Sequence, residues 1–196
     1  MNRSFLRGLV ELVALLAVVL IGMQFLMHHV ISKDVVRGTS MQPSLQSGDR
    51  LYSIRNKAVK RHAIVVVHAP DKPGELYIKR VIGMPGDTLK VVAGKLYVND
   101  HYQKEPYLSA SFKHHAVRTY AARLGVAQDS IQYTTDFNIQ TLASTQAKHV
   151  PAGQYFVMGD NRLVSHDSRD FGFVSQAQIQ SVVLWRYWPL NQWQWY

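Results

Sequence analysis

Cysteine is absent from this chain of 196 residues. The absence excludes disulfide bonds, thiolate nucleophiles and thiolate metal sites, and it suits a domain that folds outside the cytoplasm without oxidation. Histidine occurs in two adjacent pairs, His28 with His29 and His114 with His115. Neighbouring side chains diverge on a strand or a helix, so neither pair chelates a metal well. We therefore expect no metal and no other cofactor.

Acidic residues are few: the chain has 13 Asp and Glu against 22 Lys and Arg, which gives a formal net charge of +9. A charge of this size is typical of some nucleic-acid-binding proteins. Here the basic residues are dispersed, with no dense run and no recognisable nucleic-acid module. Attraction to an anionic membrane surface explains the charge better. We predict membrane lipid as a partner, and no nucleic acid.

Long apolar runs are absent except for one, at residues 9–31, whose centre at residues 12–21 contains no polar side chain. At about 1.5 Å per residue, a helix of this length reaches roughly 34 Å, enough to cross a hydrocarbon core of about 30 Å. The end of the run, from Met27 to Ile31, lacks the small-x-small pattern of a cleaved signal peptide. We predict an uncleaved transmembrane anchor.

The charges beside this anchor barely distinguish its two orientations, because Arg3 and Arg7 precede it while Lys33 and Arg37 follow it. The lack of cysteine in the remainder favours the outside. We predict a single-pass protein of the plasma membrane, with residues 1–8 in the cytoplasm and the part after the anchor extracellular.

Beyond the anchor, short runs of alternating apolar and polar residues end at Gly, Pro, Asn or Asp, a pattern typical of strands joined by turns. The predicted strands are residues 51–54, 64–68, 76–82, 88–92, 96–99, 155–158 and 182–188. Residues 100–150 are more polar and contain one expected short helix, at 117–124. We predict a mainly β core at 32–99 and 151–196, interrupted by a smaller inserted lobe at 100–150.

Ser40 lies in the stretch GTSMQPSL at residues 38–45 and is the candidate nucleophile. A serine hydroxyl reacts slowly until a base takes its proton, and Lys79, in the predicted strand 76–82, is the candidate base. Apolar neighbours destabilise an ammonium ion and would lower its pKa from roughly 10.4 towards about 7 to 8. The alternative is that Lys79 is a half-buried strand residue whose amine reaches water.

A third segment, GDNRLVSHDSRDFG at residues 159–172, bears on this choice. Together with residues 38–45, 48–52 and 77–89, and in the same order and spacing, it resembles the bacterial type I signal peptidases. The resemblance covers most of the chain outside the inserted lobe. It implies an N-terminal transmembrane helix, a β-sheet catalytic core of the signal peptidase type, and a membrane-anchored serine endopeptidase that removes signal peptides from exported preproteins.

By this resemblance, Ser40 and Lys79 form a serine-lysine dyad, and the hydroxyl of Ser165 holds the lysine amine by a hydrogen bond. Structural ion pairs are implied for Arg80, Asp160, Asp167 and Arg169. The alternative for these charges is a set of solvated surface pairs.

The oxyanion of the tetrahedral intermediate needs hydrogen-bond donors, and the resemblance implies the backbone N–H of Ser40 as one of them. Gram-negative members of the family carry a hydroxyl side chain two residues before the nucleophile. This chain has Gly38 there, as Gram-positive members do, so the second donor is absent or is replaced by a backbone group or a water.

Three other functions fit part of the sequence. A Ser-His-Asp triad would use His62, His68 or His166, the last beside Asp167, but none lies in a recognisable triad motif. A self-cleaving repressor-type protease shares the serine-lysine chemistry but carries a DNA-binding domain instead of a spanning helix. The non-enzymatic alternative is a membrane-tethered binding module with a degenerate peptidase site.

Preprotein signal peptides are the partners that the resemblance implies, with small residues at the first and third positions before the cut. The aromatic C-terminal residues 185–196 either rest against the membrane or pack into the core. The sequence carries no signal for an oligomeric state.

Overall fold

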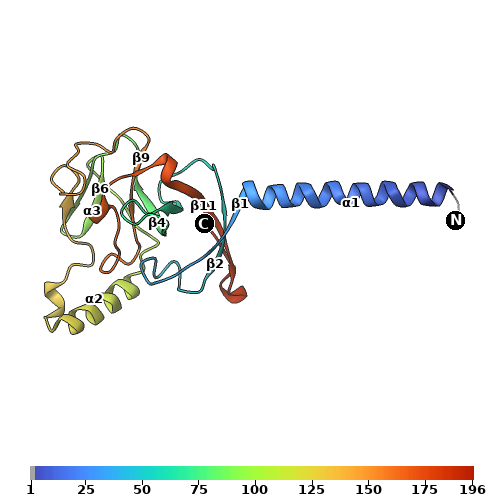
Figure 1. The fold of residues 1–196 in the computed structure, drawn as a ribbon. Helices are drawn as coiled ribbons and strands as arrows, with labels where there is room; N and C mark the ends of the chain where they lie inside the picture. The colour runs from blue at the N-terminus through green and yellow to red at the C-terminus, as the bar shows by residue number, and fades with distance from the viewer. Residues whose placement is uncertain (1–2) are drawn as a thin grey trace.

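The computed structural model describes residues 3–196, so residues 1 and 2 of the predicted cytoplasmic N-terminus lie outside the described part. A single long helix, α1 (Arg3–His29), projects from a globular part made of two antiparallel sheets, as Figure 1 shows. The fold class predicted from the sequence is confirmed: an apolar N-terminal helix is followed by a mainly β core.

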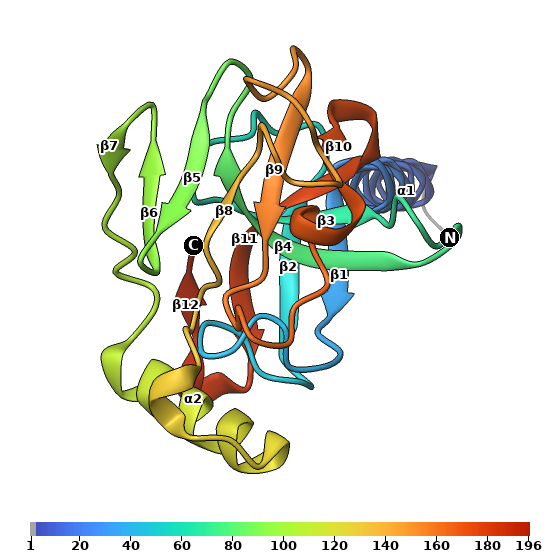
Figure 2. The ribbon, with the colours of Figure 1, turned by 90° about the vertical axis from the view of Figure 1, so that its left-hand side faces the viewer.

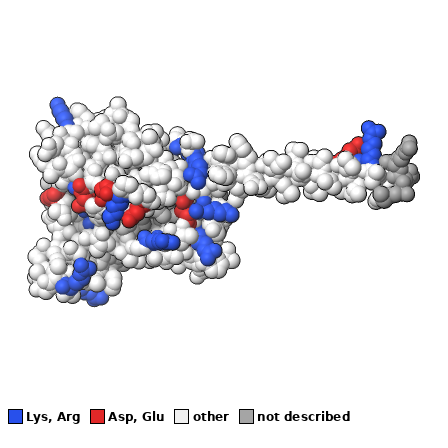
Figure 3. All heavy atoms as spheres, viewed as in Figure 1, with Lys and Arg blue, Asp and Glu red and all other residues white. Residues whose placement is uncertain are grey.

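Helix α1 is the one helix of the described chain that is long and apolar enough to cross a membrane, with a mean hydropathy of 2.5 over its most apolar window. Figure 3 shows it as an uncharged stem with charged residues only near its far end, where Arg7 and Glu11 form a salt bridge. The helix ends at His29, so Ile31, which the apolar run assigned to the anchor, instead begins strand β1 (Ile31–Val35). Pairing with the next strand decides this boundary, since apolarity alone does not distinguish a helix end from a buried strand.

The larger sheet contains eight strands in the order β1-β2-β11-β3-β4-β9-β10, with β12 added beside β11, and all its pairs are antiparallel. Its remaining members are β2 (Arg50–Ile54), β3 (Ile64–His68), β4 (Leu76–Gly83), β9 (Gln154–Met158), β10 (Val174–Ser175), β11 (Ile179–Trp188) and β12 (Gln194–Trp195). Strand β1 follows directly from α1 and is one edge of this sheet.

The smaller sheet has the order β7-β6-β5-β8 and lies on the side of the globular part away from β1, as Figure 2 shows. Its strands are β5 (Leu89–Val92), β6 (Lys95–Val98), β7 (His101–Tyr102) and β8 (Phe137–Asn138). It therefore joins strands from both sides of residue 100, where the predicted inserted lobe begins.

The helical segments besides α1 are short. They are α2 (Ala110–Leu124), α3 (Ser168–Phe171) and the 3-10 turns η1 (Gln128–Ser130), η2 (Gln176–Gln178) and η3 (Leu190–Gln192). Helix α2 is longer than the predicted helix at 117–124. Ser109 caps its start by accepting a hydrogen bond from the Phe112 N–H, and Gly125, with φ +69°, ends it.

All seven predicted strands are present, and the largest difference is at β11, which begins at Ile179 rather than 182. Their apolar side chains form three buried clusters. One cluster lies between the two sheets and includes Leu89, Ile139, Val150 and Phe156, so the segment 100–150 shares its core with the flanking strands. Residues of β4 and β9 are part of this core, and the candidate site lies where these strands meet the loop after β1.

Candidate active site

Lys79 extends from β4 into the interior between two loops and is 4 % exposed. Its Nζ donates a hydrogen bond to Ser40 Oγ at 3.1 Å and another to Ser165 Oγ at 3.3 Å. Ser40 comes from the loop between β1 and β2, and Ser165 from the loop after β9. Three distant segments thus bring together the three residues predicted to form the dyad and its support.

The surroundings of Lys79 favour the neutral amine. Burial, the largest cause, lowers its pKa to about 8. The charges of Asp167, Asp170 and Asp160 act against this shift, and that of Arg169 adds to it. None of these carboxylates forms a salt bridge with Lys79 within residues 3–196. A large fraction of the amine is therefore free to accept a proton near pH 8.

The loop that carries Ser40 is held by the backbone of the loop after β9. The N–H of Asn161 donates to the Ser40 carbonyl at 2.9 Å, and its side-chain Nδ2 donates to the Thr39 carbonyl at 3.3 Å. Gly38 has a φ of +82° with no atom near the place of a Cβ, so the left-handed turn rather than crowding explains glycine here. The bend at Gly38 and the Asn161 clamp together orient the Ser40 hydroxyl towards β4.

Gly159, directly after β9, lies behind the serine-lysine contact. A Cβ on this residue would lie 2.6 Å from the Ser40 carbonyl oxygen and would collide with the Ser165 hydroxyl. In the sequence Gly159 is only the first residue of the segment 159–172. The structure gives the reason for glycine, since the close approach of the two loops leaves no space for a side chain.

Asp167 and Arg169 organise the loop that presents Ser165. Asp167 is fully buried, accepts a hydrogen bond from the Gly159 N–H at 2.9 Å and binds Arg169 Nε at 2.8 Å. Burial raises the pKa of Asp167, but the hydrogen bond and charge of Arg169 outweigh it, so the pKa lies below its ordinary value. Arg169 Nη2 also donates to the carbonyl of Ser165 at 3.4 Å. The pair therefore ties the Ser165 backbone to the end of β9.

Arg80, the neighbour of Lys79 on β4, forms a two-pronged ion pair with Asp160, with Nε–Oδ1 and Nη2–Oδ2 distances of 2.8 and 2.6 Å. Both residues are buried. Arg80 also donates to the Ser44 hydroxyl at 3.0 Å, which links β4 to the Ser40 loop. The predicted pair is thus present and is buried, unlike a solvated surface pair.

A second buried ion pair, between Arg162 and Glu105, was not predicted. Tyr107, close to Glu105, donates to it at 2.8 Å, and its ring lies 4.0 Å below the Arg80 guanidinium. Tyr133 donates to the Asp160 carbonyl at 2.6 Å. Segment 100–150 therefore contacts the charged residues beside the dyad. Tyrosines and a glutamate in a polar stretch gave no periodic signal from which this contact follows.

The histidines considered for a triad lie elsewhere. His166 bonds Asp71 through Nε2 at 2.6 Å and lies 3.4 Å from Asp170 through Nδ1. His62 packs against the Tyr107 ring, and burial lowers its pKa. Within residues 3–196 no histidine nitrogen is hydrogen-bonded to Ser40. Lysine is the base that contacts the serine.

A groove of about 760 Å³ runs along the dyad between the segment after α1 and the first half of β4. Lys33, Arg37 and Tyr77 are among its lining residues, together with Ser40 and Lys79. β9 pairs with β4 only from Arg80 onwards, so the first half of β4 has one unpaired edge facing this groove. An unpaired edge accepts an added extended peptide.

Comparison with known proteins agrees with this geometry. Residues 9–188 match the family described as signal peptidase, peptidase S26. Signal peptidase I of Streptococcus pneumoniae is 36% identical over 171 residues, which cover 80% of this chain and 82% of that protein. Signal peptidase IB of Staphylococcus aureus is 31% identical over 192 residues, 95% of this chain and 93% of that protein.

Comparison with a solved structure also indicates the signal peptidase family. The crystal structure of a signal peptidase I from Enterococcus faecalis V583 superposes with a TM-score of 0.53 at 40% identity, over 64% of this chain and 97% of that one. Family match, relatives and fold agree over most of the chain, and α1 supplies the expected membrane anchor. The chain is therefore a member of the type I signal peptidase family, S26, a single-pass membrane hydrolase that acts on the signal peptides of preproteins.

Proposed function

We propose that this signal peptidase cleaves with a serine-lysine dyad made of Ser40 and Lys79. The observation that carries the proposal is the 3.1 Å contact between Lys79 Nζ and Ser40 Oγ, made by an amine that is buried and has its pKa lowered to about 8. This distance lies within the range in which a base takes a proton from a nucleophile.

The reaction proceeds in two halves. Lys79 takes the hydroxyl proton of Ser40 while Oγ attacks the carbonyl carbon of the scissile bond. The resulting ammonium gives that proton to the leaving amine, the C–N bond breaks and an acyl-enzyme forms. Lys79 then takes a proton from a water that attacks the ester, and it returns the proton to Ser40 as the signal peptide leaves.

The backbone N–H of Ser40 supplies one donor for the oxyanion. No acceptor within residues 3–196 takes its hydrogen bond, which supports this role. Gly38 offers no hydroxyl, so the second donor is a backbone N–H or a water. Arg80, Asp160, Asp167, Arg169 and Ser165 keep the two loops and β4 in register and do not react.

The signal peptide lies extended in the groove beside β4 and adds a strand to its unpaired edge. The groove begins at the residues that follow α1, so the peptide reaches the dyad while its apolar part is still in the bilayer. We place residues 1–8 in the cytoplasm and the β core at 32–99 and 151–196, with its lobe at 100–150, outside the plasma membrane.

The C-terminal aromatic residues support contact between the globular part and the lipid surface. Trp193 and Trp195 are about half exposed, at 50 % and 53 %, while Trp185 packs against both of them. The turn η3 lies on the side from which α1 leaves the globular part (Figure 1). Indole rings favour the headgroup zone, so this corner rests on the lipid surface.

Processing of a preprotein by the purified full chain in detergent tests the dyad. Ser40→Ala and Lys79→Ala each abolish cleavage if the proposal holds, and retained cleavage by either variant refutes it. Proteolysis of intact cells tests the orientation: a tag after Tyr196 is digested from outside, whereas a protected tag places the site in the cytoplasm.

A further inference from the structure

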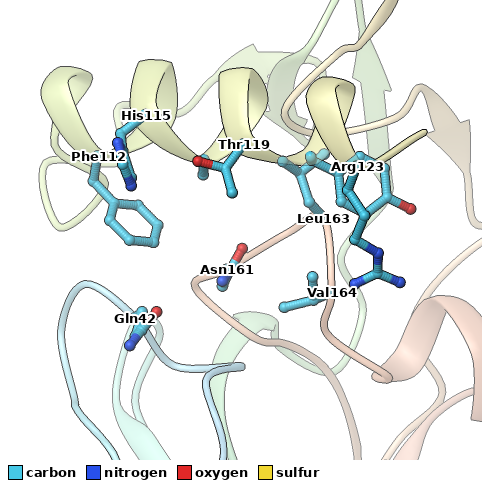
Figure 4. A pocket seen from close by; sticks show the side chains of 10 residues that line it. Gln42, Phe112, His115, Thr119, Arg123, Asn161, Leu163 and Val164 are labelled. Atoms are coloured by element: carbon cyan, nitrogen blue, oxygen red, sulfur yellow. The ribbon is translucent and has the colours of Figure 1, made fainter. Parts of the chain in front are cut away.

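A second cavity, of about 210 Å³, lies between α2 and the loop after β9, on the other side of the Ser40 loop (Figure 4). Phe112 and His115 line one end and Arg123 and Val164 the other. From Phe112 to Arg123 the helix rises about 16 Å, the span of roughly five extended residues. The proposed mechanism leaves this cavity unused.

The cavity is lined in part by the loop that carries Ser40. Gln42 lines it and follows Ser40 by two residues, so their Cα atoms are at most about 7.6 Å apart. Asn161 lines it too, and is the residue that clamps the Ser40 carbonyl. The side-chain Oδ1 of Asn161 is buried and has no hydrogen-bond partner among residues 3–196, and in Figure 4 the side chain points towards α2. A chain leaving the dyad on this side meets these two residues first.

The position of the cavity decides which part of a substrate reaches it. The groove beside β4 starts next to α1, whereas α2 lies at the end of the globular part away from α1 (Figure 1). A preprotein runs from its membrane-embedded signal segment through the cleaved bond to its mature chain. The residues before the bond therefore lie in the groove, and the residues after it continue towards α2.

The cavity lining contains a basic residue and no acidic one. Arg123 lies at its end, 5.9 Å from the ring of Tyr120, and forms no ion pair within residues 3–196. No Asp or Glu is among the lining residues, which are Gln42, Phe112, His115, Ala116, Thr119, Tyr120, Arg123, Asn161, Leu163 and Val164. A cavity with a basic residue at its end and no acidic residue in its lining matches an acidic side chain and disfavours a basic one.

We propose that this cavity binds the first residues of the mature chain, directly after the cleaved bond, and selects an acidic over a basic side chain there through Arg123. The inference rests on the proposed function, since it takes its direction from cleavage at Ser40. It assigns α2 to substrate binding.

Three sets of peptides test it, identical up to the cleaved bond and carrying Glu, Gln or Lys at one of the first five positions after it. The full chain in detergent is expected to cleave the best-placed Glu peptide with a kcat/KM about two- to fivefold above the Lys peptide, the size of an exposed ion pair. Arg123→Gln brings this ratio close to one.

Arg118→Gln is the matched control, because Arg118 is exposed on α2 and does not line the cavity. It keeps the wild-type ratio. As a second variant, Thr119→Trp fills the cavity and lowers the kcat/KM of a long peptide relative to one that ends two residues after the cut.

Equal cleavage of Glu and Lys peptides at all five positions, or the same ratio in Arg123→Gln as in Arg118→Gln, overturns the inference. So does a long-to-short ratio unchanged in Thr119→Trp. These results leave the proposed function intact as long as the wild-type chain cleaves and Ser40→Ala does not. Failure of the wild type to cleave any of the peptides refutes the proposed function instead.

Discussion

The two sheets of the molecule each carry a lysine on an alternating strand, and the two amines have opposite surroundings. Lys79 on β4 is buried and contacts two hydroxyls. Lys90 on β5 has a side chain that is 40 % exposed and forms a salt bridge with Asp100 at 2.6 Å. Both lysines lie on strands among apolar residues, so a strand position alone does not distinguish a base from a surface charge.

The difference between them is the partner that the fold provides. A carboxylate in contact favours the ammonium form, whereas burial beside neutral oxygens favours the amine. Of the three carboxylates near Lys79, Asp160 is paired with Arg80, Asp167 is paired with Arg169, and Asp170 lies beside His166. The buried ion pairs thus keep negative charge out of contact with Lys79, and this separation is what makes the amine a base.

Removal of each amine is expected to give the largest difference in effect between the two lysines. Lys79→Met is expected to lower kcat/KM by roughly 10²- to 10⁴-fold, the usual contribution of a general base, or more. Lys90→Met removes an exposed pair and leaves kcat/KM within about twofold of wild type. Peptide cleavage by the two purified variants, at equal folded concentration, measures both. Similar losses in the two variants contradict the assignment of Lys79 as base.

The ion pairs Arg80–Asp160 and Lys90–Asp100 differ in burial, since the first is buried and the second is exposed. Asp160→Ala leaves the Arg80 guanidinium buried without a counter-charge, which costs about 3 to 5 kcal/mol in the free energy of unfolding. Asp100→Ala affects an acid at the surface and changes stability little, because water replaces the lost contact. Denaturant titration of both variants measures the difference. Equal midpoints show that the Arg80 pair is hydrated in solution.

The pH dependence of cleavage reports the protonation of Lys79. Lys79 accepts a proton only as the free amine, and its pKa is lowered to about 8. Activity therefore rises with pH through about 8, and below this value kcat/KM falls roughly tenfold per pH unit. A pH profile of kcat/KM between pH 6 and 10, on a substrate without ionisable groups near the cut, reports this pKa. A flat profile down to pH 7 is incompatible with a lysine base.

Much of the fold followed from the sequence because its strands are short, alternating and bounded by turn residues. Helix α1 and the fold class are confirmed. The errors lie in segments whose structure depends on strand pairing. Ile31 was assigned to the anchor because it continues the apolar run, and no strand was predicted at 31–35, yet β1 hydrogen-bonds to β2 there. The two-residue strands β7 and β8 carry too little pattern to be recognised, although they complete the smaller sheet.

The candidate site was predictable where a residue type carries its own chemistry in a motif, as for Ser40 and Lys79. Contacts between distant, irregular segments were not. Glu105 and Arg162 are 57 residues apart, and neither lies on a periodic element. The role of Gly159 also required coordinates, since only the approach of the Ser40 and Ser165 loops shows that a Cβ has no space.

Substitution of Ser165 is expected to have a smaller effect than removal of Lys79. It distinguishes two roles of the Ser165 hydroxyl, which are to orient the Lys79 amine and to shift its pKa. Its Oγ accepts a hydrogen bond from Lys79 and so stabilises the ammonium form slightly. Ser165→Ala therefore lowers the pKa of Lys79 and moves the acid limb of the pH profile to lower pH. It also frees the side chain to move, which reduces kcat by roughly tenfold. Ser130→Ala, on the exposed turn η1, is the control and changes neither quantity.

The two readouts for Ser165→Ala distinguish a specific role from general damage. A loosened fold exposes Lys79 to water, and hydration raises its pKa and moves the acid limb to higher pH. A fall in kcat together with a shift to lower pH is therefore the result that only a hydrogen bond to the amine explains. A fall in kcat with a shift to higher pH means that Ser165 acts through packing, and the hydroxyl then has no part in orienting the base.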